Sequence, residues 1–318
     1  MLPQTSTTRL APSPTGALHL GNAFAFLVNW AFARANGVRI ILRIEDLDGP
    51  RVKWGAADDI VGTLRWLGID WDEGPHFQSG DLSPYVRAMR TLAERGLAYP
   101  SDLSRGEIEA AGGAPQEGSG ESRFPASLRP RDWDAVGGFV DTGTNWRFAT
   151  PDRVVRFCDR VAGEQAINPS ASIGDFVLWT KRGVPSYQLA VVVDDARQGV
   201  TEVVRGNDLL DSAARQALLY EALGFAAIPN YSHVPLVVGP DGRRLAKRHG
   251  DSRVEHYRGK GVPAEAVVGL VAHWCGMTPR LEPLTAIEFR DGFSLGRLAG
   301  AFTRQFLPKD DAWLLSQA

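Results

Sequence analysis

The stretch that decides the fold lies near the N-terminus and reads Arg9-Leu-Ala-Pro-Ser13-Pro-Thr-Gly16-Ala-Leu-His19-Leu-Gly21-Asn22. Its first residues predict a short strand, its Pro and Gly residues predict a tight turn, and Asn22 can cap a helix. Such a turn directs backbone N–H groups and the positive end of the helix dipole toward one point. We therefore expect an anion site, where Gly21 lets a phosphate approach the backbone and His19 donates to it.

A second stretch, Arg244-Leu-Ala-Lys247-Arg248, lies far downstream and carries three cations. A short run of like charges is usually a solvated loop. Its position after the last predicted sheet strand favours a role at the same site, because cations there can neutralise phosphate oxygens. Together the two stretches predict a site that holds a triphosphate from two sides.

The bulk composition excludes several classes of protein. A chain of 318 residues suggests two or three domains, and 44% hydrophobic and 23% charged residues are ordinary for a globular protein. A net charge of −2 gives no general support for nucleic-acid binding, which would need a local patch. Cys158 and Cys275 are too few for a disulfide framework or a zinc cluster. Without a membrane-spanning run or a signal peptide, we expect a cytoplasmic protein.

Hydrophobic patterning over the first hundred residues predicts alternating strands and helices. The apolar run over 38–44 is rich in β-branched residues, which is typical of a strand buried on both faces. Such alternation is typical of a parallel α/β sheet. We expect strands over 9–11 and 38–44 and helices over 22–36, 58–67 and 83–95.

The alternation breaks near residue 97 and returns near residue 175. The intervening residues carry scattered strand signals and include the sequence AGGAPQEGSG at 111–120, which we interpret as a flexible loop. The chain therefore predicts an α/β domain interrupted by an insertion, followed by a mostly helical segment. Beyond the insertion we expect strands over 188–193, 199–204 and 232–238 and helices over 212–223 and 263–275.

Several long motifs, in one order, resemble those of the class I aminoacyl-tRNA synthetases of the glutamate branch. Residues 19–22 are similar to the HIGH signature of that family and residues 244–248 to its KMSKS signature. The stretches Arg43-Ile-Glu45-Asp46-Leu-Asp48 and Tyr187 to Gly206 resemble further parts of the catalytic domain. The resemblance implies a Rossmann-type catalytic domain that activates glutamate with ATP, which would arrive with Mg²⁺.

The resemblance also implies four segments. Residues 1–96 and 176–238 would be the two halves of the catalytic domain. Residues 97–175 would be an inserted subdomain like the acceptor-binding domain of the family. Residues 239–318 would hold the signature loop and a helical segment like the stem-contact region, and an anticodon-binding domain is not expected.

Matching positions supply a glutamate pocket and an ATP site. Glutamate has two carboxylates and one ammonium group, so its pocket requires arginines and an acid. His19 and Lys247 would be catalytic, with Lys247 stabilising the charge that develops on the phosphates. The resemblance assigns glutamate binding to Arg9, Ala11, Ser13, Glu45, Tyr187 and Arg205, and ATP binding to Pro12, His19, Gly21, Asn22, Arg244 and Lys247.

Two motifs need separate interpretation. In the KMSKS-like stretch, Arg244 and Ala246 replace a lysine and the serine, whereas Lys247 is retained. The pair Asp194-Asp195 could suggest a metal site. We interpret it instead as adjacent acids at a strand end, satisfied by caps or water, and we expect no metal ligands.

Zinc is a further point of departure from the family. Many short members bind zinc in the insertion through a Cys-x-Cys sequence that follows a tyrosine. Here Ser101 and Leu103 follow Tyr99, where those cysteines would be. A structural zinc site needs about four N or S ligands. We therefore expect no zinc and an insertion held by apolar packing alone.

The length of the chain favours a short subgroup of this family. Its members activate L-glutamate without tRNA and transfer it to queuosine in the anticodon loop of tRNA(Asp). Val191 and the sequence Gly206-Asn-Asp208 also suit that subgroup. The resemblance thus implies L-glutamate, ATP and tRNA(Asp) as partners, and we expect a monomer. Two alternatives stay open: a truncated or atypical synthetase that charges tRNA(Glu), and a non-catalytic tRNA-binding paralogue.

Overall fold

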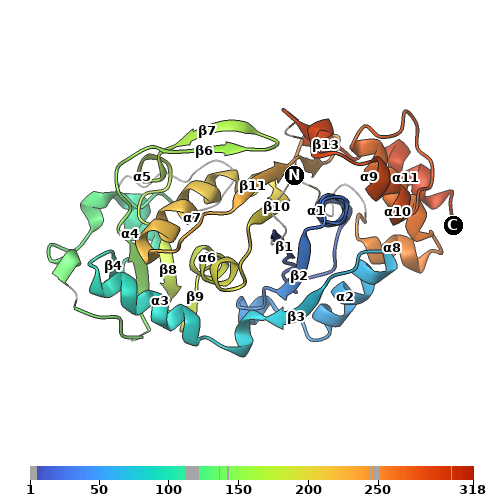
Figure 1. The fold of residues 1–318 in the computed structure, drawn as a ribbon. Coiled ribbons are helices and arrows are strands. Elements are labelled where there is room, and N and C mark those ends of the chain that lie inside the picture. Colours follow the sequence, from blue (N-terminus) through green and yellow to red (C-terminus); the bar gives the residue numbers. More distant parts are fainter. Residues whose placement is uncertain are drawn as a thin grey trace.

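A computed structural model describes residues 6–111, 122–135, 137–141, 143–243, 245, 251–301 and 303–318. At its centre lies a parallel sheet (Figure 1). Strands β1 (Thr7–Leu10), β2 (Arg39–Ile44) and β3 (Glu73–Phe77) pair in that order, and β10 (Glu202–Gly206) pairs with β11 (Asn230–Val234). The Thr201 N–H donates to the Thr7 carbonyl at 2.9 Å and brings β10 beside β1. The resulting order, β3-β2-β1-β10-β11, confirms the expected parallel α/β sheet.

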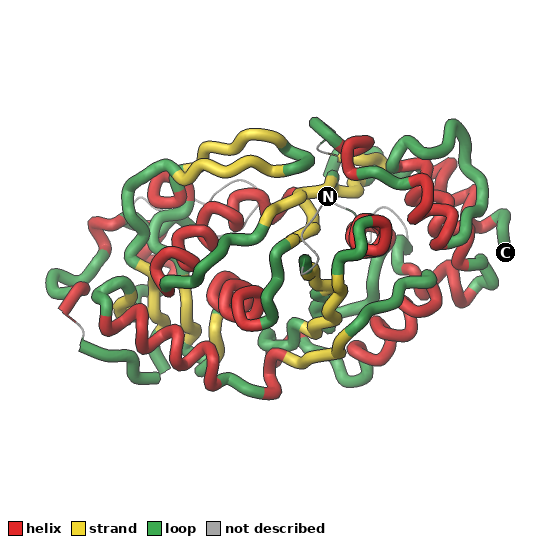
Figure 2. The backbone as a smooth tube through the Cα atoms, in the orientation of Figure 1, coloured by secondary structure: helices red, strands yellow, loops and turns green. Residues whose placement is uncertain are grey.

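Helices connect these strands and pack beside them (Figure 2). The longest, α1, follows β1 and buries most of its apolar residues in the main core, as its helical spacing predicts. Gly37 has a φ of 64° and ends this helix in the left-handed conformation that glycine tolerates. The helices of the sheet domain are α1 (Leu20–Ala35), α2 (Ala56–Trp66), α3 (Ser83–Glu94) and α7 (Leu210–Leu223).

The strand predicted over 188–193 is wrong, because this segment belongs to helix α6 (Tyr187–Arg197). Its β-branched run reads as a buried strand. The helix is buried along almost its whole length and packs against α3, α7 and β8 (Val177–Thr180), so apolar residues occur on every side of it. A helix that is apolar all round gives no helical periodicity.

The strand predicted over 232–238 divides at Pro235 into β11 and β12 (Leu236–Val238). Proline has no N–H for a sheet ladder, so the chain changes partner there. Strand β12 pairs in parallel with β13 (Thr303–Gln305), close to the C-terminus. This pairing is the exception to the expected helical remainder, which comprises α8 (Val254–Gly259), α9 (Ala264–Trp274), α10 (Ala286–Gly292) and α11 (Pro308–Leu315).

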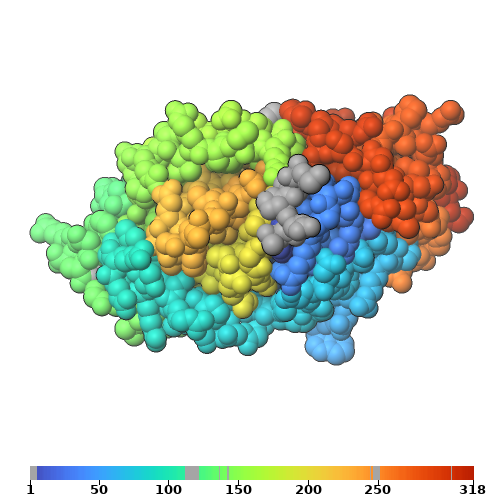
Figure 3. All heavy atoms as spheres, in the orientation of Figure 1, coloured from blue at the N-terminus to red at the C-terminus, as the bar shows by residue number. Residues whose placement is uncertain are grey.

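These C-terminal helices cover the N-terminal half of the sheet domain. Helices α9 and α10 pack on α1, and their apolar residues join the same core as those of α1 and β2. In Figure 3 the orange and red C-terminal surface accordingly lies against the blue N-terminal one. Within the described residues, none of the helices is both long and apolar enough to cross a membrane.

The insertion forms its own antiparallel sheet, at the opposite end of the molecule from the C-terminus (Figure 1). The sheet has the order β4-β5-β8-β9, and a separate hairpin of β6 and β7 packs near α7 and β11. The loop expected over 111–120 lies almost entirely outside the described residues. The elements are β4 (Ala98–Ser101), α4 (Arg105–Ala110), β5 (Asn145–Phe148), β6 (Val155–Asp159), β7 (Gly163–Ile167), α5 (Pro169–Ser172), β8 and β9 (Val184–Pro185).

Apolar packing alone does not hold the insertion, because one buried carboxylate, Asp175, joins several of its parts. The Tyr99 hydroxyl donates to Asp175 Oδ2 at 2.5 Å and the Thr150 N–H donates to Oδ1 at 2.9 Å. Arg129 Nε and Nη2 donate to the two oxygens at 2.6 and 2.8 Å. A carboxylate held by an arginine, a hydroxyl and a backbone N–H is a strong polar cross-link. No cluster of three or more His, Cys, Asp or Glu fit for a metal occurs among the described residues.

We predict that Asp175→Asn lowers the free energy of unfolding by about 2–4 kcal/mol, because the Arg129 guanidinium loses its charged partner. Urea denaturation measures this change. Arg131→Gln, at an exposed arginine of the same segment, should stay within about 0.5 kcal/mol of the wild type. EDTA should leave the wild-type midpoint unchanged. An Asp175→Asn protein as stable as the wild type would contradict the cross-link.

Candidate active site

A pocket of about 200 Å³ lies where the carboxyl ends of β1 and β10 meet. This point is where the strand order of the sheet reverses, the usual ligand site of an open α/β sheet. The five predicted glutamate residues that line it come from four segments of the chain. They are Arg9, Ala11, Glu45, Tyr187 and Arg205, and the predicted ATP residues His19, Gly21 and Asn22 line the same pocket.

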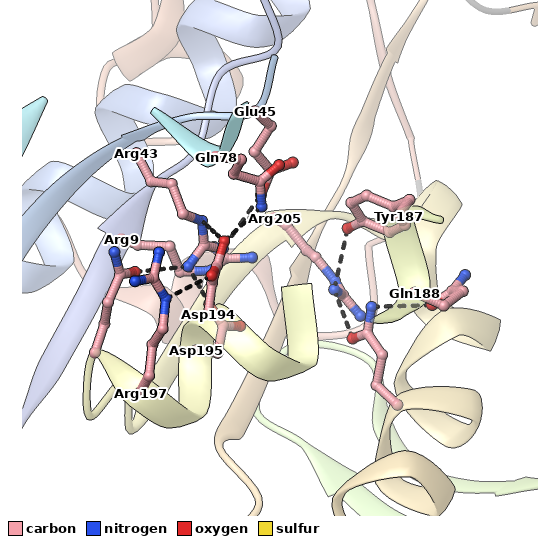
Figure 4. A network of polar contacts seen from close by, with 12 residues as sticks. Arg9, Arg43, Glu45, Gln78, Tyr187, Gln188, Asp194, Asp195, Arg197 and Arg205 are labelled. Atoms are coloured by element: carbon pink, nitrogen blue, oxygen red, sulfur yellow. Dashed lines mark hydrogen bonds and ion pairs between the residues drawn. The ribbon is translucent and has the colours of Figure 1, made fainter. Parts of the chain in front are cut away.

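Behind Glu45 and Arg9, which line the pocket, lies a buried layer of charged residues that we call its floor, and it contains an arginine that sequence reasoning did not assign. Arg43 Nη1 lies 2.8 Å from Asp195 Oδ1, Nη2 lies 3.2 Å from Glu45 Oε1, and the side chain is fully buried (Figure 4). Burial alone would lower the pKa of Arg43, but the charges of Asp195, Glu45 and Asp194 raise it overall. Arg43 therefore stays a cation. Residues two apart on a strand lie on the same face. The spacing of Arg43 and Glu45 was therefore the sequence signal that could have predicted their contact.

The acids Asp194 and Asp195 are counter-ions, which corrects the expectation of caps or water at a strand end. They stand on helix α6 and are buried. Asp194 Oδ1 accepts from Arg197 Nε at 2.7 Å, and Asp195 Oδ1 lies 3.4 Å from Arg9 Nε. In this cluster Arg9, Arg43 and Arg197 thus meet three carboxylates, those of Glu45, Asp194 and Asp195.

Glu45 forms the acidic wall of the pocket. Burial raises the pKa of Glu45 above its ordinary value, while the nearby Arg43 and Arg9 act in the opposite direction. A ligand cation placed against this carboxylate would favour its ionised form. The position suits the ammonium group of an amino acid.

Arg205 differs from the arginines of the floor, because its hydrogen-bond partners among the described residues are all neutral. Its Nε donates to His233 Nε2 at 3.0 Å and its Nη1 donates to Gln216 Oε1 at 2.9 Å. Nη1 also lies 3.4 Å from the Tyr187 hydroxyl, and Nη2 lies 3.3 Å from the Leu209 carbonyl. The residue is only 6% exposed. Within the described part of the chain, its positive charge is therefore left for an anionic ligand.

The start of α1 differs in detail from the sequence prediction. His19, and not Asn22, is the residue that caps the helix, and its Nδ1 accepts from the N–H groups of Gly21 and Asn22 at 3.1 and 3.3 Å. A Cβ on Gly21 would lie 3.0 Å from the imidazole, so this glycine makes room for the ring. The imidazole thus takes the N–H groups that we expected to face a phosphate. With Nδ1 accepting, a neutral ring carries its proton on Nε2.

Described residues that flank the predicted basic stretch lie beside His19. A cavity of about 730 Å³ is lined by His19, Lys53, Leu245 and Asp251, among others. The Leu20 N–H donates to the Ser252 carbonyl at 2.9 Å, which ties the end of this loop to the start of α1. Arg244 and Lys247 themselves lie outside the described residues, so their roles stay predictions.

Two predicted residues lie away from the main pocket. Ser13 lines an adjoining cavity of about 660 Å³, which shares Glu45 and Tyr187 with the pocket. Pro12 is not among the residues lining these three cavities, and its carbonyl accepts from the Glu45 N–H at 2.9 Å. Pro12 therefore positions the acidic wall.

Comparison with known proteins gives consistent matches. A curated relative from Rhodopirellula baltica, named Glutamyl-Q tRNA(Asp) synthetase, is 48% identical over 286 residues, which cover 85% of each chain. Another of that name, from Symbiobacterium thermophilum, is 44% identical and covers 91% of this chain and 93% of its own. The crystal structure of glutamate-tRNA synthetase from Elizabethkingia anophelis has a TM-score of 0.79 at 27% identity, covering 98% of this chain and 70% of that chain.

The family model described as tRNA synthetases class I (E and Q), catalytic domain, matches residues 5–297. This span includes the central sheet, the insertion and the pocket between β1 and β10. The match confirms the resemblance drawn from the motifs and the expected Rossmann-type synthetase fold. The chain therefore belongs to the class I tRNA synthetases of the glutamate and glutamine branch.

Proposed function

We propose that this chain activates L-glutamate with ATP to glutamyl-adenylate without tRNA, and then transfers the glutamyl group to queuosine in the anticodon loop of tRNA(Asp). The observation that carries the activation step is Arg205, a buried cation with neutral partners that lines the same pocket as Glu45. A positive charge without a counter-ion and a carboxylate in the same pocket fit an amino acid with an anionic side chain. The names of the relatives at 48% and 44% identity support the choice of acceptor.

In this proposal the side-chain carboxylate of glutamate binds Arg205 and its ammonium binds Glu45. The α-carboxylate then lies toward His19 and the start of α1, where the ATP phosphates would lie. One of its oxygens attacks the α-phosphorus, the bond to the bridging oxygen of the β-phosphate breaks, and pyrophosphate leaves. ATP would bring Mg²⁺ with it as a substrate complex.

His19 and Lys247 would stabilise the phosphate charge in this step. The proton on His19 Nε2 can donate to a phosphate oxygen, and Nδ1 anchors the ring on the helix N-terminus. Lys247, with Arg244, would approach from the loop that ends beside Leu20. Gly21, Asn22 and the edge formed by Leu236 and Val237 would contact the nucleotide.

The division of the chain into segments belongs to the same proposal. Residues 97–175 and 239–318 would contact tRNA on either side of the catalytic halves, 1–96 and 176–238. The enzyme would act as a cytoplasmic monomer without zinc. Transfer would form an ester between the activated carboxyl group and a queuosine hydroxyl, with AMP as the leaving group.

We expect ATP–pyrophosphate exchange that depends on glutamate and proceeds without tRNA. After incubation with ATP, glutamate and tRNA(Asp), mass spectrometry of the digested tRNA should place the glutamyl group on queuosine. Exchange that requires tRNA, or glutamate found on the terminal ribose of tRNA(Glu), would instead identify an ordinary synthetase. Absence of any exchange with glutamate would contradict activation.

Arg205→Gln should raise the KM for glutamate about 30- to 150-fold, because one charge-assisted contact to the substrate carboxylate is worth about 2–3 kcal/mol. The KM for ATP should change little. Arg90→Gln, at an exposed arginine of α3, is the matched control and should behave like the wild type. Steady-state exchange kinetics measure both constants. An unchanged glutamate KM in Arg205→Gln would remove this residue from the pocket.

His19→Asn should lower kcat about 100-fold or more while the melting temperature stays close to that of the wild type. Asparagine is a good N-cap, so it preserves the start of α1, but it lacks the distal donor of the imidazole. His19→Ala removes both, and should also lower the free energy of unfolding by about 1 kcal/mol. Wild-type kcat in His19→Asn would show that His19 only caps the helix.

A further inference from the structure

Behind Arg205 lies a buried histidine and aspartate pair that the activation step does not use directly. Parallel pairing of β10 and β11 places Arg205 opposite His233. Arg205 Nε donates to His233 Nε2 at 3.0 Å, and His233 Nδ1 lies 2.6 Å from Asp159 Oδ2. His233 and Asp159 are each 1% exposed. The three side chains therefore form one chain of contacts from the β6–β7 hairpin to the glutamate pocket.

Asp159 is saturated as a hydrogen-bond acceptor. Its Oδ1 accepts from the N–H groups of Val161 and Ala162 at 2.9 and 2.8 Å, and both oxygens lie 3.1 Å from the His233 N–H. Burial alone would raise the pKa of Asp159, but these hydrogen bonds and that from the His233 ring lower it overall. An ionised Asp159 can only accept, so the proton between the two side chains belongs to His233 Nδ1.

Arg205 fixes the other ring nitrogen. A guanidinium Nε–H can only donate, so His233 Nε2 must accept. The imidazole is therefore neutral, with its proton on Nδ1. Burial and the positive charge of Arg205 lower the pKa of His233 to about 4, although the hydrogen bond that His233 donates to Asp159 acts in the opposite direction. Both neighbours thus select a single tautomer.

We propose that His233, oriented by Asp159, is a positioning residue that sets the affinity for the glutamate side chain by fixing the Arg205 guanidinium with its positive charge uncompensated. A carboxylate placed next to Nε would neutralise Arg205 within the fold. A neutral acceptor fixes the position of the guanidinium through a hydrogen bond and leaves its charge for the ligand. This inference rests on the proposed function, since it deepens the role of the same pocket.

Other contacts on Arg205 are consistent with this role. Its guanidinium carbon lies 5.2 Å from the centre of the Tyr231 ring, which stacks against the His233 ring. Gln216 accepts from Nη1 and is itself held, because its Nε2 donates to Gln188 at 3.1 Å. Every one of these groups is neutral, so the whole shell orients the cation without cancelling it.

Two substitutions separate positioning from a purely structural role. In His233→Gln the amide oxygen can take the place of Nε2 and accept from Arg205. In His233→Asn the shorter amide can take the place of Nδ1 and donate to Asp159, but it does not reach Arg205. If His233 only tethered the β6–β7 hairpin, His233→Gln would lower the melting temperature more than His233→Asn, because only the asparagine keeps the contact with Asp159.

We expect His233→Asn to raise the glutamate KM about 10- to 100-fold, with a smaller change in kcat and in the KM for ATP. His233→Gln should recover most of the affinity. Exchange kinetics and thermal melting measure these effects. A wild-type glutamate KM in His233→Asn would overturn the inference while leaving the proposed function intact.

The tautomer gives a readout that does not depend on activity. Nitrogen-15 NMR of labelled histidines should show one ring, absent from the spectrum of His233→Gln, with Nδ1 protonated and Nε2 unprotonated at neutral pH. An imidazolium or the opposite tautomer would overturn the inference even if both variants fail to fold. A wild-type chain that neither binds glutamate in calorimetry nor exchanges pyrophosphate would overturn the proposed function and the inference with it.

Discussion

The buried Arg43 guanidinium is the constraint on which the pocket depends. Burying a cation costs several kcal/mol of desolvation, which charged partners and hydrogen bonds around Arg43 offset. The partners of Arg43 lie on either side of the insertion in sequence. Glu45 directly follows β2, before the insertion, whereas Asp195 lies on α6, after it. Arg43 is thus satisfied only when the two halves of the sheet domain close on each other. The floor of the pocket therefore forms only when the two halves of the sheet domain pack against each other.

The charges of the floor are compensated within the protein, which leaves Arg205 as the residue that can select an anionic ligand. Arg9, although it lines the pocket, already lies near Asp195, so part of its charge is compensated within the protein. Arg205 has neutral partners and is buried, which strengthens its attraction for an anion. Charge compensation is thus uneven across the pocket. In the proposed function, this unevenness would distinguish an acidic side chain from a neutral one of the same size.

Sequence reasoning predicted the local elements and the pocket residues better than their supporting contacts. Helix boundaries such as those of α1 and α7 fall within two residues of the prediction, since glycines and apolar spacing mark them. Helix α6 was misread because burial on all sides removes its periodicity. The contact of Arg43 with Asp195, and the pairing of His233 with Asp159, depend on segments far apart in sequence. No local pattern encodes them.

Two histidines, His19 in the pocket lining and His233 behind Arg205, show how the fold determines what one type of side chain can do. At His19 the helix N-terminus supplies two N–H groups, so Nδ1 accepts and Nε2 is the protonated nitrogen. At His233 a carboxylate supplies an acceptor, so Nδ1 donates and Nε2 accepts from Arg205. The first tautomer presents a donor, as phosphate oxygens require, and the second presents an acceptor, as a guanidinium requires. The backbone and Asp159, rather than the histidines themselves, decide which chemistry each ring offers.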